Sequence, residues 1–361
     1  MEEAGKKKAL KRLLILAGTQ MILIAFFVWL LDPFYQYHAP FFGMDAVLND
    51  RDNQMPGTIR NFDYDSVLVG SSLAENFDSA FLDGTYGCST LKIIRASGSV
   101  ADLLYYLDMA EEERELKNVF WCLDIPAVYA PVEVTLYGKD TPRYLHTKTV
   151  LDDLPYLYNK EILMEKIPAM LAYAHEGINT KGQAYNWARD KQFGPARAML
   201  AYDRGNIDSG EMIVQRDFPE EAVLIARNIQ LLTEQVSSHP RTRYRFLIPP
   251  LSLLWWDCAY VNGEQDMRIY ALDQAVSALL SCENAEVYYF QNEESIVCNL
   301  DYYMDMVHYS PDISRYMLDQ MSAGHNRVDA GNWKETLACL RELAARISRE
   351  EIYRYYEAAY E

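Results

Sequence analysis

The pattern of hydrophobic and polar positions begins with one long apolar stretch. Residues 13–31 contain no charged side chain, and a helix of this length, at about 1.5 Å of rise per residue, nearly matches the roughly 30 Å hydrocarbon core of a bilayer. Basic side chains are concentrated in residues 1–12, and Asp32 follows the stretch. The positive-inside rule therefore predicts a cytoplasmic tail over 1–12, a transmembrane signal anchor over 13–31, and an extracytoplasmic chain after it.

A cleaved signal peptide is the alternative for this stretch. Cleavage requires small side chains near the end of the apolar segment, whereas residues 29–34 read Trp-Leu-Leu-Asp-Pro-Phe. The bulk of these side chains favours an anchor that stays attached to the protein. We expect the aromatic residues that follow, Phe34, Tyr35 and Tyr37, at the membrane interface.

Beyond the anchor, short apolar runs alternate with segments of helical periodicity. Strand-like runs lie at residues 66–70, 118–123, 244–248 and 286–290. Apolar residues at helical spacing lie between these runs, near residues 103–110, 219–236 and 266–280. This alternation predicts an α/β domain in which crossover helices connect the strands of a parallel sheet.

The same patterns suggest where the parts of the chain begin and end. We expect a juxtamembrane linker over residues 32–61 and the α/β domain over residues 62–325. Within that domain, residues 127–218 are rich in tyrosine and interrupted by glycines, which predicts a helical insertion. Residues 326–361 are expected to form a charged, mostly helical tail.

Two short segments far apart in the sequence carry candidate chemistry. The first strand-like run ends in Gly-Ser-Ser at residues 70–72, which predicts a turn that presents a hydroxyl at the carboxyl end of a strand. Asp305 and His308 lie just before a predicted helix start at residues 310–312. At this spacing Asp305 could accept a hydrogen bond from one imidazole nitrogen while the other nitrogen faces the serine.

Each segment also has a simpler explanation. Serine is a common helix N-cap, so the serines could cap a helix. His308 could be a core histidine that is satisfied by Asp305, without any catalytic role. The two segments together, in this order, favour a serine of residues 71–72 as a nucleophile, His308 as its base and Asp305 as the orienting carboxylate.

These segments resemble the first and last blocks of the SGNH (GDSL-type) hydrolases. The resemblance implies a flavodoxin-like, three-layer α/β/α fold with a central parallel sheet, and it maps the nucleophile to Ser72. Residues 96–102 match the second block in order and surroundings, which implies that the amides of Ser72 and Gly98 bind the oxyanion. Ser99 followed by Asp102 is also typical of a helix start, which would place the Gly98 amide at a positively polarised helix terminus.

The third block of the family is not matched. After the run at residues 118–123 comes Asp124, where the classical family has a Gly-x-Asn segment that contributes an amide. A missing oxyanion donor typically lowers the rate by about a hundredfold to a thousandfold. We expect Asp124 to be structural, with its carboxylate accepting backbone amides in the turn before Pro126, although a substrate-binding role stays open.

More narrowly, the chain resembles membrane-anchored SGNH-like proteins of Gram-positive bacteria. It is similar in plan to the accessory proteins of teichoic-acid D-alanylation and alginate acetylation. The resemblance implies an extracytoplasmic serine esterase or O-acyltransferase that acts on acetyl-type esters of a cell-envelope glycan. The alternative is a non-catalytic assembly protein that binds glycan or a membrane-bound O-acyltransferase. A lipase-like enzyme that acts on membrane lipids is a third, weaker hypothesis.

Composition adds limits to this hypothesis. The formal net charge of −18 disfavours nucleic acid and anionic polymers as partners. The six cysteines show no metal-ligand spacing, so we expect neither a metal nor a cofactor, and no disulfide network. Trp255 and Trp256 follow a predicted strand at the serine's end of the sheet, where they could form a stacking platform for a sugar, although core packing is the more common role of such residues.

Overall fold

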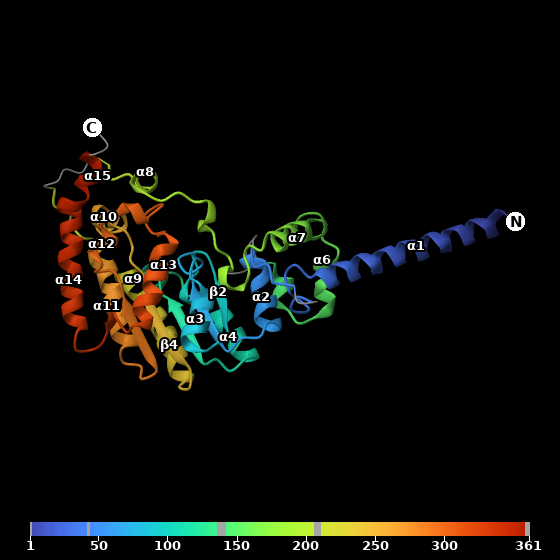
Figure 1. The fold of residues 1–361 in the computed structure, drawn as a ribbon, viewed down its shortest axis with the longest axis horizontal. Helices are drawn as coiled ribbons and strands as arrows, with labels where there is room; N and C mark the ends of the chain where they lie inside the picture. Colours follow the sequence, from blue (N-terminus) through green and yellow to red (C-terminus); the bar gives the residue numbers. More distant parts are fainter. Residues whose placement is uncertain (1, 42–43, 136–141, 206–210, 358–361) are drawn as a thin grey trace. The chain divides into compact units, whose positions relative to one another are not determined.

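The computed structural model describes residues 2–41, 44–135, 142–205 and 211–357. The chain divides into two compact units. Unit 1 combines residues 1–62 with residues 137–181, and unit 2 combines residues 63–136 with residues 182–361. The ribbon in Figure 1 follows the elements of both units along the chain.

Unit 2 contains a central, mostly parallel six-stranded sheet with the order β2-β1-β3-β4-β5-β6. Its strands are β1 (Ser66–Gly70), β2 (Thr90–Ile94), β3 (Asn118–Cys122), β4 (Arg243–Ile248), β5 (Ala285–Tyr289) and β6 (Arg327–Val328). The first five strands are parallel, and β6 pairs antiparallel with β5. The predicted mixed α/β architecture is confirmed, and the four predicted strands correspond to β1, β3, β4 and β5.

Helices cover the two faces of this sheet. On one side α4 (Val100–Glu113), α9 (Pro219–Ser238) and α11 (Gln265–Leu279) pack in a row, while α13 (Pro311–Ser322) packs with α3 (Ser79–Tyr86). Every residue of β1 and β2 is buried, as expected for parallel strands that have helices on both faces. Unit 2 also contains α5 (Ile125–Val128), α8 (Pro195–Ala198), α10 (Leu253–Val261), α12 (Glu294–Val297), α14 (Trp333–Arg346) and α15 (Tyr353–Glu357).

The strand order creates a natural position for a site. The chain passes from β1 to β2 in one direction along the sheet and then returns past β1 to β3. In open α/β sheets, such a reversal leaves a crevice outside the carboxyl ends of the two strands that flank it. The segments that follow β1 and β3 therefore meet at this crevice.

The start of α4 confirms a local prediction. The Ser99 side chain accepts a hydrogen bond from the Asp102 amide at 3.1 Å, which satisfies one of the free amides of the first turn. The Asp102 carboxylate does not complete a reciprocal capping box. It accepts hydrogen bonds from the amide and hydroxyl of Thr135 instead, at 2.6 and 2.7 Å.

Residues expected to form a tail belong to the body of unit 2. The edge strand β6 pairs with β5, and α14 packs against α10 and α11. The segment predicted as one insertion, residues 127–218, is shared between the units, because residues 137–181 cluster with unit 1 and the rest with unit 2.

Unit 1 begins with α1 (Glu2–Leu31), which is long and apolar enough to span a membrane. The unit also contains α2 (Arg51–Asn61), α6 (Leu154–Leu157), a π-helical turn over Ile162–Lys166, and α7 (Ile167–Glu176). The sequence predicted a linker over residues 32–61. The structure instead forms α2 there, with six consecutive buried residues from Gln54 to Ile59.

The last turn of α1 enters the core of unit 1. Val28 is fully buried and packs with Phe34, Tyr156 and Ile162, among other apolar residues. Phe34 and Tyr35 are each 3% exposed, so both rings are shielded from lipid, and their predicted level at the membrane interface stays a prediction. The chain turns back immediately after α1 and carries both rings into the core.

Candidate functional site

The turn that carries Ser72 depends on a glycine at the end of β1. A Cβ at Gly70 would come within 2.6 Å of the Ala74 Cβ and 3.1 Å of the Cys122 carbonyl oxygen. Only a residue without a side chain allows the turn to pass this close to β3. Ser71 and Ser72 therefore leave the sheet at the crevice between β1 and β3.

Ser72, His308 and Asp305 form a continuous hydrogen-bonded relay. The Ser72 hydroxyl lies 2.8 Å from His308 Nε2, and His308 Nδ1 lies 2.7 Å from Asp305 Oδ2. The other oxygen of Asp305 accepts the amides of Val307 and His308 at 2.8 and 2.7 Å. The geometry expected from the spacing of these residues is present.

The electrostatics of Asp305 favour its ionised form. Burial by itself would raise the pKa of Asp305, but hydrogen bonds from the His308 ring and from two backbone amides, with the charge of His308, lower it below its usual value. An ionised Asp305 holds a proton on His308 Nδ1. His308 Nε2 is then free to accept the proton of Ser72.

A cavity of about 290 Å³ opens onto this relay. Its polar lining comes from Ser71, Ser72, Ser97, Gly98, Asp124 and His308, and its apolar lining comes from Leu73, Pro126, Ala127, Ala130, Leu251 and Val307. The serine and the imidazole are therefore accessible from one small, mixed cavity.

Gly98 lines this cavity, but its amide is engaged. The Gly98 amide donates to the Arg95 carbonyl at 2.9 Å, and a Cβ at Gly98 would lie only 2.8 Å from the Arg95 Cβ. The adjacent Ser97 has a φ of +51°, a left-handed conformation that costs energy for a residue with a side chain. The Ser72 amide, in contrast, donates to no acceptor among the described residues.

Asp124 has a different partner from the one predicted. Its side chain does not cap α5, so the expectation that it accepts backbone amides in this turn is wrong. Asp124 Oδ2 accepts the hydroxyl of Ser71, and Oδ1 is shielded from solvent with no hydrogen bond from a described residue. Burial raises the pKa of Asp124 to about 6, against the lowering effects of the Ser71 hydrogen bond and the His308 charge.

The two tryptophans proposed as a sugar platform are core residues. Trp255 is 5% exposed and Trp256 is fully buried, and neither lines the cavity. Trp256 donates its indole N–H to Gln291 at 3.0 Å, and Arg268 lies 4.2 Å from the centre of the Trp255 ring. The start of α10 turns both rings into the interior, which corrects that prediction.

Trp187 is a site residue that the sequence did not indicate. Its indole N–H donates to the Ser72 carbonyl oxygen at 2.9 Å, and its ring meets the His308 ring edge-on at 5.3 Å between centroids. It lies 115 positions from Ser72, in a segment without strong periodicity. No local signal in the sequence could have found it.

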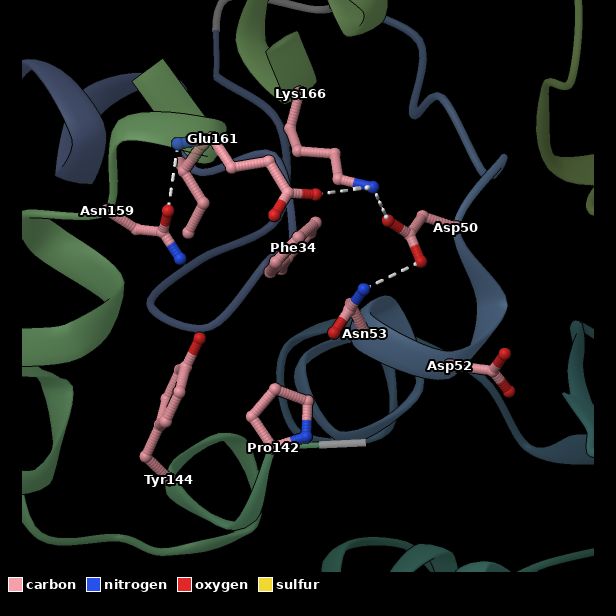
Figure 2. A pocket seen from close by; sticks show the side chains of 10 residues that line it. Phe34, Asp50, Asp52, Asn53, Pro142, Tyr144, Asn159, Glu161 and Lys166 are labelled. Carbon is pink, nitrogen blue, oxygen red and sulfur yellow. Dashed lines mark hydrogen bonds and ion pairs between the residues drawn. The ribbon is translucent and has the colours of Figure 1, made fainter. Parts of the chain in front are cut away.

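A second cavity, of about 350 Å³, lies in unit 1. Figure 2 shows Lys166 between Asp50 and Glu161, with distances of 2.9 and 3.4 Å. Asn53 donates to Asp50 at 2.9 Å, so the charged and amide groups satisfy one another. Neither cavity holds a metal-binding cluster, since no group of three metal-ligating side chains occurs among the described residues.

Comparisons with known proteins do not assign a family. No family model and no curated protein matches the chain. A solved structure described as "a putative platelet activating factor from Streptococcus pneumonia" is similar at 12% sequence identity with a TM-score of 0.38, over 76% of this chain and 89% of that chain. At this level of similarity, the function has to be inferred from the chain's own geometry.

Proposed function

We propose that the protein is a serine esterase or O-acyltransferase that works through an acyl ester on Ser72. The observation that carries this proposal is the relay from the Ser72 hydroxyl through His308 to Asp305, which opens onto a cavity at the carboxyl end of β1. A hydroxyl within hydrogen-bond reach of a base, with the base oriented by a carboxylate, is the arrangement that activates a serine.

The reaction would proceed in two steps, acylation of Ser72 and deacylation. The Ser72 oxygen attacks the ester carbonyl while its proton passes to His308 Nε2, and the imidazolium then gives this proton to the departing alcohol. In the second step, water or an acceptor hydroxyl gives a proton to His308 Nε2 and attacks the acyl carbonyl. The bond between the acyl carbon and the Ser72 oxygen then breaks, and the imidazolium returns the proton to that oxygen. Water completes hydrolysis, whereas a sugar or polyol hydroxyl completes transfer.

The oxyanion would bind first at the Ser72 amide, which has no acceptor among the described residues. The Gly98 amide could become a second donor if the peptide turned away from Arg95, which accepts it at 2.9 Å. Asp124 lines the same cavity, and its ionised form would repel an oxyanion. The site would therefore have weaker oxyanion stabilisation than an SGNH hydrolase with all three blocks.

The substrate we propose is a small acyl ester of a cell-envelope glycan. A cavity of about 290 Å³ is at the lower limit of typical ligand sites, and small apolar groups such as Ala127 and Ala130 line part of it. This suits an acetyl-sized group better than a long acyl chain. The apolar helix α1 supports a membrane location, and the basic residues before it support an extracytoplasmic unit 2.

The test is fluorophosphonate labelling of the full chain in detergent micelles, followed by intact-mass analysis. We expect stoichiometric labelling that is lost in Ser72→Ala and in His308→Ala. Ser277→Ala and His325→Ala, which change exposed side chains of the same types, should label like the unmodified protein. If the folded protein is not labelled, or if Ser72→Ala is still labelled, the proposal is wrong.

A second candidate function is a non-catalytic assembly protein that docks a membrane-bound O-acyltransferase or binds glycan. The engaged Gly98 amide and the carboxylate at Asp124 favour it, because both weaken catalysis at this site. Affinity purification from membranes separates the two functions. A partner that is retained equally by Ser72→Ala and His308→Ala, without any probe labelling of the unmodified protein, would support assembly.

A further inference from the structure

The outer end of α1 carries a cluster of rings. Trp29 is 38% exposed, and its ring lies 5.3 Å from that of His38 and 6.0 Å from that of Phe41. His38 Nε2 also lies 2.7 Å from the Trp29 carbonyl oxygen. Tryptophan side chains at the end of an apolar helix are typical of the membrane–water interface. This cluster therefore marks the level of the interface on α1.

The core of unit 1 lies beside the same turn of α1 as this ring cluster. Val28, one residue before Trp29, is fully buried in the core of unit 1, and α6 packs against α1. An apolar stretch over residues 13–31 is only just long enough for a bilayer core of roughly 30 Å. If α1 spans the membrane, its last turn cannot extend far above the lipid, and the parts of unit 1 that contact it lie at the membrane surface.

Apolar side chains of unit 1 are exposed beside this turn. A crevice is lined by Leu30 and Leu31 of α1 together with Met44 and with Met170 and Leu171 of α7. Met44 and Leu171 are each 46% exposed. The exposed apolar surface of α7 is thus continuous with the surface of the helix that would contact lipid.

We propose that this face of unit 1, formed by Phe41, Met44, Leu171 and Ala174 beside the end of α1, lies in the lipid of the outer leaflet. The face would be a second membrane contact, in addition to α1, at the boundary between head groups and acyl chains. Apolar side chains on an interfacial helix bind lipid at this depth.

The polar side chains that line the crevice are compatible with a position at the boundary between head groups and acyl chains. Asp45 and His38 also line it, and both can stay hydrated among head groups, whereas they would be costly in the hydrocarbon core. Contact with lipid also accounts for the exposure of Met44 and Leu171, since burial of apolar area at the interface is favourable. The proposal goes beyond the chemistry at Ser72, and it depends on α1 being in the membrane.

The experiment uses the full chain in nanodiscs of phosphatidylcholine, with a benzophenone amino acid in place of Leu171. The matched control carries the same group in place of Glu176, an exposed residue of α7 that is about 140° around the helix from Leu171. After irradiation, lipid adducts are counted by mass spectrometry. A thermal melt of each variant checks that both are folded.

We expect lipid adducts at position 171 to exceed those at position 176 by about fivefold or more, as for a helix that has one face in the interface. Equal yields at the two positions, or no lipid adduct at position 171, would overturn the proposal. A cross-linked dimer without lipid adducts would assign the face to a second copy. A protein adduct seen in cell membranes, without lipid adducts in nanodiscs, would assign it to a membrane partner.

Discussion

At the scale of single residues, Trp187 connects the two halves of the candidate relay. It donates to the Ser72 carbonyl at 2.9 Å and packs edge-on against His308. It does not contact the reacting atoms, so we regard it as a positioning residue. The indole would hold both the serine turn and the imidazole in the orientation that the proton transfer needs.

Trp187→Phe keeps an aromatic ring beside His308 but removes the N–H that bonds to Ser72. A net hydrogen bond is worth about 0.5–1.5 kcal/mol, so we expect the second-order rate of Ser72 labelling to fall by about threefold to tenfold. The pH midpoint of labelling should stay the same in Trp187→Phe and should move in Trp187→Ala. If Trp187→Phe labels at the unmodified rate, the indole hydrogen bond does not position Ser72.

The raised pKa of the Asp124 carboxyl predicts that the stability of the protein depends on pH. Burial raises its pKa from 3.8 to about 6 in the folded protein. Between about pH 4 and pH 6, the Asp124 carboxyl is ionised in the unfolded chain but still protonated in the folded chain. The free energy of unfolding therefore falls as the pH rises through this range. The difference between the two pKa values, at about 1.4 kcal/mol per pH unit, gives a total loss of stability of about 3 kcal/mol, which is complete above pH 6.

Asp124→Asn removes this titration and leaves an oxygen that can still accept from Ser71. We therefore expect the stability of the variant, relative to the unmodified protein, to improve between about pH 4 and about pH 7. Chemical denaturation of the full chain in micelles at both pH values measures the difference. A difference that does not change with pH would mean that Asp124 titrates normally.

At the scale of elements, strand β2 carries a buried lysine that links two segments near the candidate site. Lys92 on β2 is almost fully buried, and its amine donates to the Glu75 carbonyl at 2.7 Å and to the Ala184 carbonyl at 2.9 Å. Burial lowers its pKa to about 7. The neutral amine still carries two N–H donors, which is the number needed for the two carbonyls. Lys92 thus ties the turn that follows Ser72 to the segment that carries Trp187.

Lys92→Met keeps an unbranched side chain, one heavy atom shorter, and removes both hydrogen bonds. We expect slower labelling of Ser72, by about tenfold, because each buried carbonyl that loses its partner costs about 1–3 kcal/mol and loosens the turn. Lys117→Met is the control, since Lys117 is exposed and its ion pair with Asp65 contributes little. Equal labelling rates in the two variants would show that Lys92 has no influence on the site.

At the scale of the whole molecule, the net charge of −18 should influence which esters reach the site. A negative field repels anionic substrates, and salt screens this repulsion. We expect kcat/KM for an anionic ester to rise severalfold between about 10 and about 150 mM salt, where the Debye length falls from about 30 to about 8 Å. A neutral ester such as p-nitrophenyl acetate should show no change. A fall for the anionic ester would reveal a local basic surface at the cavity.

Much of the architecture could be predicted because it depends on local patterns. The runs that became β1, β3, β4 and β5 each contain at least three apolar or aromatic residues in succession, and β6, with two residues, is too short for such a pattern. The strand β2 was not predicted, because Lys92 divides its five residues and leaves no more than two apolar residues in succession. Its buried lysine is compatible with a strand only because two distant carbonyls accept its hydrogen bonds.

By itself, the sequence determined the apolar helix α1, the alternation of strands and helices, and the local pairing of Asp305 with His308. Each of these depends on spacing within one segment, whereas the grouping of Ser72 with this pair rested on the resemblance to the SGNH blocks. The tertiary structure alone decided the partners of Asp124, the burial of Trp255 and Trp256, and the place of Trp187 beside the relay. These outcomes depend on side chains more than ten positions apart packing together, and hydrophobic periodicity does not indicate which distant groups will be in contact.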